Sequence, residues 1–314
     1  MPTDNSKRPE TPEIIAILLL TMDQQEVTRR CLQTLMLVRR PNIHLLVLDN
    51  GSKDATGTMI REQFPKVDYH YSNENMGVAG GRNHLAKLAQ KKYHPDYFVI
   101  LDNDTIVEPD FIKKLHAPFA EDDKLAITSP KIKVLGQPDR LYGAGGCRVN
   151  FYSGKTMHRG YGEMDVGRYD GSSDCVASGG CMMIRAPVFW RVDGFDLTFN
   201  PYGPEDLDFV FRLRKAGWAT QYVSDAVIYH ELLPSKTFEK GNYSEIYARN
   251  RVRHWLIFLG RHGTIFQKLG FWVFTAPFLL LRVAFRELMS GNPKGITGLF
   301  KGGFSYIFTK GNSK

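Results

Sequence analysis

The sequence predicts an α/β protein with a mostly parallel central sheet that helices cover on both faces. Two observations lead to this fold class. Strand-like and helix-like segments alternate along the first hundred residues, in the order expected of β-α units. The predicted strands are also nearly continuous apolar runs, which is typical of parallel strands that are buried on both faces.

The first half of the chain carries four predicted strands with three helices between them. The strands are short apolar runs that end in turn residues, whereas the helices repeat their apolar residues every three or four positions. We expect the strands within 13–21, 43–54, 67–81 and 97–104, and the helices at 25–38, 55–64 and 82–93. Ligands bind at the carboxyl ends of the strands in sheets of this kind, so polar residues directly after the strands are candidate site residues.

The second half of the chain is less regular. We expect strands within 125–135 and 220–230, a strand and the start of a helix within 175–195, and a helix at 204–218 that Gly217 ends. Acidic residues crowd the first turn of that last helix, as the helix dipole favours. Residues 136–174 are rich in Gly, Tyr and Arg and are predicted to form loops and short strands.

Composition divides the chain into a flexible N-terminus at 1–12, a main α/β domain at 13–245 and a C-terminal helical region at 246–314. The first residues are polar and lack the apolar core of a signal peptide, which predicts a cytoplasmic protein. The four cysteines show no CxxC or metal-ligand spacing, which is typical of free thiols in a reducing compartment. A net charge of +8 suits nucleic acid, anionic lipid or a phosphorylated ligand.

The C-terminal region joins this basic charge to an apolar segment. Glu287 is the only acidic residue from Ile246 to the end, and the segment 269–285 is rich in aromatic and aliphatic residues. A membrane-spanning helix needs about 20 apolar residues, whereas Pro277 and Arg282 interrupt this segment. We therefore expect a helix that lies on the inner face of the cell membrane and no nucleic-acid partner. A helix packed on the protein's own core is the alternative.

Carboxylates follow two of the predicted parallel strands and open a later helix. Asp49 ends the second strand, and Asp102 and Asp104 end the fourth. Glu205 and Asp206 begin the helix further along. In an extended segment Asp102 and Asp104 point the same way, and two like charges so close require a positive partner or full solvation. Oxygen ligands gathered at one sheet edge suit a hard divalent cation. The sequence therefore predicts a metal site here, with a solvated turn as the alternative.

A glycine-rich stretch, NENMGVAGGRN, follows the third strand. Its glycines at 77, 80 and 81 would let the backbone approach a ligand, and Arg82 and Asn83 open the next helix, where an anion is favourable. The spacing matches neither G-x-G-x-x-G nor the P-loop, so neither nucleotide fold is expected. A turn that simply needs small residues is the alternative.

These pieces together resemble one family. The segments LDNGSKDAT, NENMGVAGGRN, FVILDNDTIVEPD, ASGGCMMIRAPVFWRVDGFD, YGPEDLDFVFRLRKAGW and VIYHE span 14–230 and occur in the order found in family 2 glycosyltransferases. The chain is most similar to the branch that includes bacterial rhamnosyltransferases, and YARNRVRHW at 247–255 resembles the segment after that family's catalytic domain. The resemblance implies a GT-A fold for 13–245, followed by a basic and aromatic helical extension.

The resemblance also implies roles for individual residues. Asp206 would be the general base, and the neighbouring Glu205 would raise its pKa. Asp102 and Asp104 would hold Mg²⁺ or Mn²⁺, and His230 is a further candidate ligand at the end of a strand. The residues expected to contact the nucleotide-sugar donor are Thr21, Asn75, Gly81, Arg82, Asn83, Asp102 and Arg249, together with Asp49, whose carboxylate suits the imide N–H of uracil or thymine.

Two further regions, 178–183 and 136–174, are expected to bear on acceptor binding. The segment SGGCMM at 178–183 would line the acceptor side, where Gly179 and Gly180 leave room for a sugar, and Asp208 is expected to be a helix-face residue. The first strand ends in LTMDQQ, where Asp23 stands in place of the family's amide, while 136–174 matches no part of the family and is a candidate for acceptor specificity.

The residues and the resemblance predict an inverting, metal-dependent sugar transfer by one direct displacement. The donor would be a nucleotide-diphosphate sugar, with dTDP- or UDP-sugars favoured, and the acceptor a glycan or lipid-linked glycan. A sugar-1-phosphate nucleotidyltransferase is one alternative, although LTMDQQEVTRR lacks the glycine-rich signature such enzymes need after the first strand. A non-catalytic glycan-binding protein is the other, although binding alone would not require Asp102, Asp104 and Asp206 together. An oligomer is possible.

Overall fold

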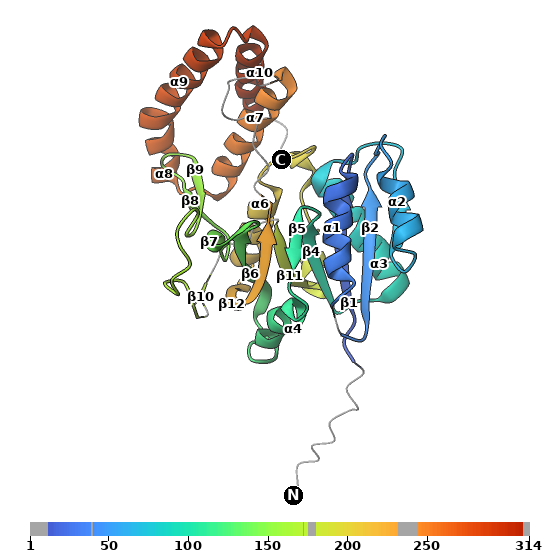
Figure 1. Ribbon diagram of the computed structural model, residues 1–314. Coiled ribbons are helices and arrows are strands. Elements are labelled where there is room, and N and C mark those ends of the chain that lie inside the picture. Colours follow the sequence, from blue (N-terminus) through green and yellow to red (C-terminus); the bar gives the residue numbers. More distant parts are fainter. Residues whose placement is uncertain (1–11, 39, 172, 175–179, 232–243, 310–314) are drawn as a thin grey trace, which may run out of the picture.

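The computed structural model of the protein describes residues 12–38, 40–171, 173–174, 180–231 and 244–309. Its centre is a sheet with helices on both faces, and a group of C-terminal helices extends away from one end of it (Figure 1). The strands are β1 (Ile15–Thr21), β2 (Ile43–Asp49), β3 (Asp68–Tyr71), β4 (Tyr97–Asp102), β5 (Thr105–Val107), β6 (Leu125–Val134), β7 (Gln137–Ala144), β8 (Cys147–Asn150), β9 (Lys155–His158), β10 (Ser173–Asp174), β11 (Cys181–Arg185) and β12 (Ala219–His230).

The first four strands form the parallel block that the sequence predicts. β1 pairs in parallel with both β2 and β4, and β2 pairs in parallel with β3. β11 runs antiparallel to β4 and connects this block to β6 and β12, which are parallel to each other, giving the sheet order β10-β12-β6-β11-β4-β1-β2-β3. The register places Thr21 opposite Asp49 and Leu20 opposite Asp102, so both acids lie at one edge of the sheet.

The apolar runs of the sequence arise because both faces of the parallel block are buried. Neighbouring residues of a strand point to opposite faces. In β1, Ile17 and Leu19 belong to one apolar core, whereas Leu18 belongs to the core on the other face. Each position along the strand therefore has to be apolar, and polar residues appear only where the strands leave the core.

Helices cover both cores, and one of them begins earlier than expected. The helices of this part are α1 (Gln25–Leu35), α2 (Thr56–Gln63), α3 (Gly77–Tyr93), α4 (Phe111–His116), α5 (Ala186–Arg191) and α6 (Glu205–Lys215), with 3-10 turns η1 (Ala117–Ala120) and η2 (Leu197–Phe199). The glycine-rich stretch was expected to be a loop, but it forms the first turns of α3.

The glycines of this stretch lie too close to neighbouring side chains to carry a side chain themselves. A Cβ on Gly81 would lie 2.9 Å from Leu20 Cδ2, and a Cβ on Gly77 would lie 2.5 Å from Asn200 Oδ1. These glycines therefore permit close packing.

The C-terminal region consists of α7 (Glu245–His262), α8 (Ile265–Gly270), the π-helical turn η3 (Phe271–Thr275), α9 (Ala276–Met289) and α10 (Pro293–Thr309). An apolar cluster that includes Leu207, Phe258, Phe271 and Tyr306 joins these helices to α6. The C-terminal helices are thus anchored on the helix that carries Glu205 and Asp206.

The segment around Pro277 is longer and more continuous than expected. α8, η3 and α9 form one helical run, Ile265–Met289, and Pro277 lies in the first turn of α9 without ending it. The π-helical turn η3 directly precedes this first turn. Within the described residues, this run alone is long and apolar enough to cross a membrane, by length and composition only, and 11% of its most apolar 18-residue window is buried.

Candidate active site

A cleft of about 590 Å³ opens at the carboxyl ends of β1 and β4, facing the N-terminus of α6. The predicted site residues that line it are Thr21, Asn75, Arg82, Asp102, Gly180, Glu205, Asp206 and His230. These residues come from seven different elements and connections, and the fold gathers them because parallel strands end at a common edge.

Asp102, Asp104 and His230 form a cluster whose ligand atoms all lie within 4.8 Å of one another. His230 Nε2 lies 3.3 Å from Asp104 Oδ1. β4 ends at Asp102, so the following residues form a turn rather than the extended segment we expected. The turn still brings both carboxylates together, because Asn103 is held on its other side by hydrogen bonds to Thr28 Oγ1 at 2.9 Å and Gln24 Oε1 at 2.8 Å.

The donor set suits a divalent cation. His230 Nδ1 lies 2.9 Å from the carbonyl oxygen of Glu231, and since a carbonyl only accepts, Nδ1 donates and Nε2 is the ring nitrogen that can bind a metal. Burial, followed by the nearby Asp102 carboxylate, raises the pKa of Asp104 to about 6. Oδ1 of Asp104 is buried without a hydrogen-bond partner among the described residues. A bound cation would relieve both conditions.

Arg82 is the positive partner that the paired carboxylates required. Its guanidinium is 5% exposed and lies between two acids, with Nη2 2.8 Å from Asp102 Oδ1 and Nη1 3.1 Å from Glu205 Oε1. Arg82 therefore connects the acids at the sheet edge to the acidic pair on α6, and it fixes the distance across the cleft.

Glu205 and Asp206 differ sharply in their surroundings. Glu205 is 6% exposed, and burial, followed by the Asp206 charge, raises the pKa of Glu205 to about 7 although Arg82 opposes the shift. Asp206 is only partly buried and lines the cleft. Glu205 is thus a packed, Arg-bound group, while Asp206 is the carboxylate that a ligand in the cleft can reach.

At the far side of the cleft, polar residues of β2, β3 and the connections after them form a corner. Asn75 accepts hydrogen bonds from Asn50 Nδ2 at 3.0 Å and Gly77 N at 2.8 Å. Asp49 is 1% exposed and accepts from Ser52 N at 2.8 Å and Tyr69 Oη at 3.0 Å, just behind the cleft lining. This corner is built by side chains that hold one another in place.

Asp23, which departs from the family's usual amide, also takes part in this corner. Its Oδ1 accepts the backbone N–H of Lys53 at 2.6 Å. The carboxylate therefore fastens the loop after β1 to the loop after β2, which explains how an acid is accommodated here.

Other predicted donor residues are not brought into the cleft. Gly81 packs on Leu20, and Asn83 uses both ends of its amide on the backbone of Phe195, at 2.9 and 2.7 Å. Arg249 is exposed on α7 and does not line the cleft. Gly179 lies outside the described residues.

The N-terminus of α3, expected to attract an anion, is already partnered by protein groups. Val78 N donates to Pro201 O at 2.8 Å, and Gly80 N donates to Asn200 Oδ1 at 3.3 Å. An anion in the cleft would therefore meet Arg82 rather than a row of free N–H groups.

Sequence reasoning missed Tyr142 on β7 and His158 on β9, which both line the cleft. The Tyr142 ring stacks on His230 with centroids 4.4 Å apart and planes 10° apart, and it also lies near His158, at 5.0 Å between centroids. Burial, followed by the charges of Asp102 and Asp104, raises the pKa of Tyr142 to about 12. The only signal in the sequence was the richness of 136–174 in Gly, Tyr and Arg.

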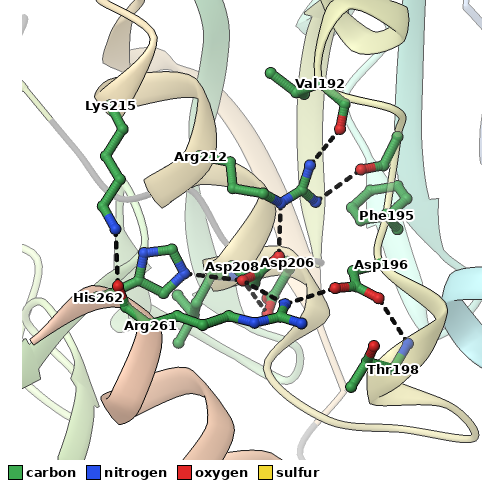
Figure 2. Close-up of polar contacts among 12 residues, drawn as sticks. Val192, Phe195, Asp196, Thr198, Asp206, Asp208, Arg212, Lys215, Arg261 and His262 are labelled. Atoms are coloured by element: carbon green, nitrogen blue, oxygen red, sulfur yellow. Dashed lines mark hydrogen bonds and ion pairs between the residues drawn. The ribbon is translucent and has the colours of Figure 1, made fainter. Parts of the chain in front are cut away.

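Asp208 is the clearest correction to the sequence interpretation. It was expected to be a helix-face residue without a specific role, but its side chain is fully buried and bound by Arg212, Arg261 and His262 (Figure 2). The acids in the first turn of α6 therefore have different tasks, and Asp208 serves the packing of α6 on α7.

With this sheet and a cleft at its edge, the chain has the GT-A fold of glycosyltransferases. The chain belongs to the family described as glycosyltransferase like family 2, whose model matches residues 12–255. It is 25% identical over 238 residues to the N-acetylglucosaminyl-diphospho-decaprenol L-rhamnosyltransferase of Mycobacterium tuberculosis, an alignment that covers 69% of this chain and 76% of the relative.

Solved structures agree on the fold. The crystal structure of GalNAc-T7 with UDP, GalNAc and Mn²⁺ is similar to this chain, with a TM-score of 0.61 and 12% sequence identity. The match covers 80% of this chain and 48% of GalNAc-T7, so this chain spans about half the length of that protein. The mannosyltransferase PcManGT from Pyrobaculum calidifontis in complex with GDP-Man and Mn²⁺ has a TM-score of 0.55 and 15% identity, over 99% of this chain and 83% of that chain. The family match confirms the resemblance predicted from the sequence, and these structures confirm the GT-A fold.

Proposed function

We propose that this glycosyltransferase is an inverting, metal-dependent enzyme that transfers a sugar from a dTDP- or UDP-sugar to a glycan or lipid-linked glycan. One observation carries the proposal: Asp102 and His230 of the Asp102-Asp104-His230 cluster line the same cleft as Asp206 and Arg82. A donor diphosphate and an acceptor hydroxyl can meet there.

Asp102, Asp104 and His230 would hold Mg²⁺ or Mn²⁺. Two carboxylates and one imidazole are a suitable set for Mn²⁺, and both Mg²⁺ and Mn²⁺ accept carboxylate oxygens. When bound, the cation would neutralise charge that develops on the departing nucleoside diphosphate. The Mn²⁺ recorded in both structural relatives supports this role.

Asp206 would act as the general base. Its partly exposed carboxylate would accept the proton of the acceptor hydroxyl as that oxygen attacks the anomeric carbon and the bond to the diphosphate breaks. One displacement inverts the anomeric centre, so no enzyme nucleophile is required. Glu205, bound to Arg82, would hold the first turn of α6 in place.

The choice of nucleotide rests on Asp49. Each carboxylate oxygen can accept more than one hydrogen bond, so the contacts with Ser52 and Tyr69 leave capacity for the imide N–H of uracil or thymine. A dTDP- or UDP-sugar is therefore favoured, and a rhamnosyl donor is supported by the activity that the mycobacterial relative's name gives.

Association with the membrane surface is supported by a stripe of exposed apolar residues on the C-terminal helices. Phe274, Phe278, Leu281, Phe285 and Leu288 are each at least 63% exposed, and they recur at spacings of four, three, four and three. This is the period of one helix face. The opposite face of the same helix includes the fully buried Glu287. The enzyme would lie on the inner face of the cell membrane, where lipid-linked acceptors are accessible.

A thermal-shift screen would test the proposed activity. The full chain is heated with dTDP, UDP and GDP, each with and without Mn²⁺. We expect stabilisation by dTDP or UDP that disappears without metal, because a ligand that binds only the folded state raises its melting temperature. With the matching sugar donor, Asp206→Asn should keep the shift and lose turnover. Pyrophosphate release would instead identify a nucleotidyltransferase, and full turnover by Asp206→Asn would exclude Asp206 as the base.

A further inference from the structure

A second cavity, of about 250 Å³, lies between the start of α6 and α7. Tyr202, Gly203 and Asp206 line both this cavity and the larger cleft. The carboxylate of Asp206 therefore stands where the two cavities meet. Cavities that enclose a whole small molecule measure roughly 300–1,000 Å³, so this one has room for only part of a larger ligand.

The walls of the second cavity are aromatic. Tyr202 and Tyr247 lie with ring centroids 5.3 Å apart, and Trp255 lines the cavity from the next turns of α7. Flat rings with a polar tip offer an apolar face to the C–H side of a sugar and keep their donors for its hydroxyls. Such a surface suits a glycosyl unit better than an alkyl chain.

A buried nitrogen in the same cavity lacks a partner. His254 is 1% exposed, and its Nδ1 lies 2.9 Å from the carbonyl oxygen of Tyr202. Because a carbonyl only accepts, Nδ1 donates, and Nε2 is left as an acceptor that has no hydrogen-bond partner among the described residues. Burial lowers the pKa of His254 and keeps the ring neutral. A sugar hydroxyl is the kind of donor that such a nitrogen would accept.

Positive charge lies at the rim of the cavity. Arg251 is exposed there and donates to Tyr247 Oη at 3.3 Å. Burial, followed by the charges of Arg249 and Arg261, lowers the pKa of Arg253, which stands two residues after Arg251 on the same helix. The acid at the start of α7, Glu245, is already paired with Lys301. A phosphate beside the bound sugar would meet an arginine fork that matches its geometry.

We propose that this cavity, lined by Tyr247, Arg251, His254 and Trp255, is the acceptor subsite and that it binds a sugar carrying a phosphate or diphosphate. The inference rests on the proposed function and makes it narrower: the acceptor is a glycosyl phosphate lipid rather than a neutral glycan. The sugar lies against the aromatic walls with one hydroxyl toward Asp206, and its phosphate lies at Arg251.

The test uses the full-length protein, the donor identified by thermal shift in radiolabelled form, and membranes of the cells that encode the protein as the source of acceptor. We expect the radiolabelled sugar to appear in the lipid that organic solvent extracts. We also expect mild acid to release this sugar from the lipid, because mild acid cleaves glycosyl diphosphate lipids. Arg251→Gln and Trp255→Ala should lower kcat/KM for the acceptor about 10–100-fold while the donor affinity changes less than about twofold.

A matched control removes one exposed positive charge elsewhere in the C-terminal region. Lys294→Gln on α10 should leave both constants unchanged, since Lys294 is exposed and lines neither cavity. Transfer to an acid-stable, phosphate-free acceptor, or normal acceptor kinetics in both variants, would overturn the acceptor subsite while leaving the glycosyltransferase reaction intact. A protein that binds no nucleotide with Mn²⁺ would instead contradict the proposed function itself.

Discussion

Asp208 on α6 and His262 at the end of α7 meet in a buried contact, with Oδ1 2.8 Å from Nε2 and side chains that are 0% and 2% exposed. Arg212 Nε lies 2.7 Å from the other carboxylate oxygen, and Arg261 approaches Oδ1 to 3.4 Å (Figure 2). Asp208 stands two residues after the proposed base, Asp206. This contact therefore ties the helix of the proposed base to the C-terminal helices.

Removing the carboxylate should destabilise the protein strongly. Asp208→Asn leaves two guanidinium groups and an imidazole partly uncompensated, and breaking a buried pair by removing one partner costs about 3–5 kcal/mol. The matched control is Glu26→Gln, which removes an acid that is 66% exposed and pairs with Arg29 on the surface. Its cost should stay below about 1 kcal/mol. Urea unfolding at neutral pH measures both, and equal small losses would contradict the assigned role of Asp208.

Low pH should weaken the same contact between Asp208 and the C-terminal helices. Burial alone would raise the pKa of Asp208, but hydrogen bonds from His262 and Arg212 outweigh it and hold the pKa below the ordinary 3.8. A carboxyl with a lowered folded-state pKa contributes stability that is complete above its unfolded pKa and is lost as the pH falls through its folded pKa. Below pH 3.8 the wild type should therefore lose free energy of unfolding more steeply than Asp208→Asn. Unfolding curves measured from about pH 5 downward test this, and parallel losses would contradict it.

The parts of the site that the sequence could predict are those that depend on short segments of consecutive residues. The strand that ends at Asp102 is apolar because both its faces are buried, so the first polar residues after it had to lie at the sheet edge. Asp206 was predictable for a similar reason, because a helix start after a loop collects acids and the family motif surrounds it. Local sequence carries both signals.

The parts that could not be predicted depend on contacts between distant segments. Tyr142 reaches the cleft because β7 folds back on β6, and no periodicity within 136–174 indicates that pairing. Asp208 meets His262 at a separation of 54 residues, so the first-turn acids of α6 look alike until the packing of α7 is known. Gly81 serves packing against Leu20, which the sequence cannot distinguish from ligand access.

Tyr142 should support the metal site through its ring. The ring stacks on His230 at 4.4 Å, so it restricts the orientation in which Nε2 faces the two carboxylates. Tyr142→Ala should weaken Mn²⁺ binding about 10-fold, the lower end of the effect of losing a group that orients a ligand. Tyr142→Phe keeps the stacked ring and should bind Mn²⁺ like the wild type. Electron paramagnetic resonance of free Mn²⁺ during titration gives both affinities; weak binding by both variants would assign the effect to the hydroxyl instead.

The exposed stripe on α9 should hold the enzyme on anionic membranes without crossing them. Phe278 and Phe285 are 63% and 64% exposed, and each would contribute about 1.5–3 kcal/mol if buried in lipid. Replacing both with Glu should therefore reduce binding to phosphatidylglycerol vesicles at least about 100-fold in a sedimentation assay. The matched control is the double change of Leu37 and Val166 to Glu, since these residues are 59% and 77% exposed outside the C-terminal helices. It adds the same charge and should bind vesicles nearly as the wild type does, with only a small loss from the added charge.

Extraction from cell membranes distinguishes a surface helix from a spanning one. Arg282 is exposed within the helical run Ile265–Met289, and a charged arginine near the centre of a bilayer costs about 2.5–3.5 kcal/mol. On the membrane surface the same side chain would instead lie beside anionic headgroups. We therefore expect alkaline carbonate to release the wild-type protein from membranes into the soluble fraction. Protein that stays in the membrane after carbonate treatment, and that leaves only with detergent, would show that Ile265–Met289 spans the bilayer.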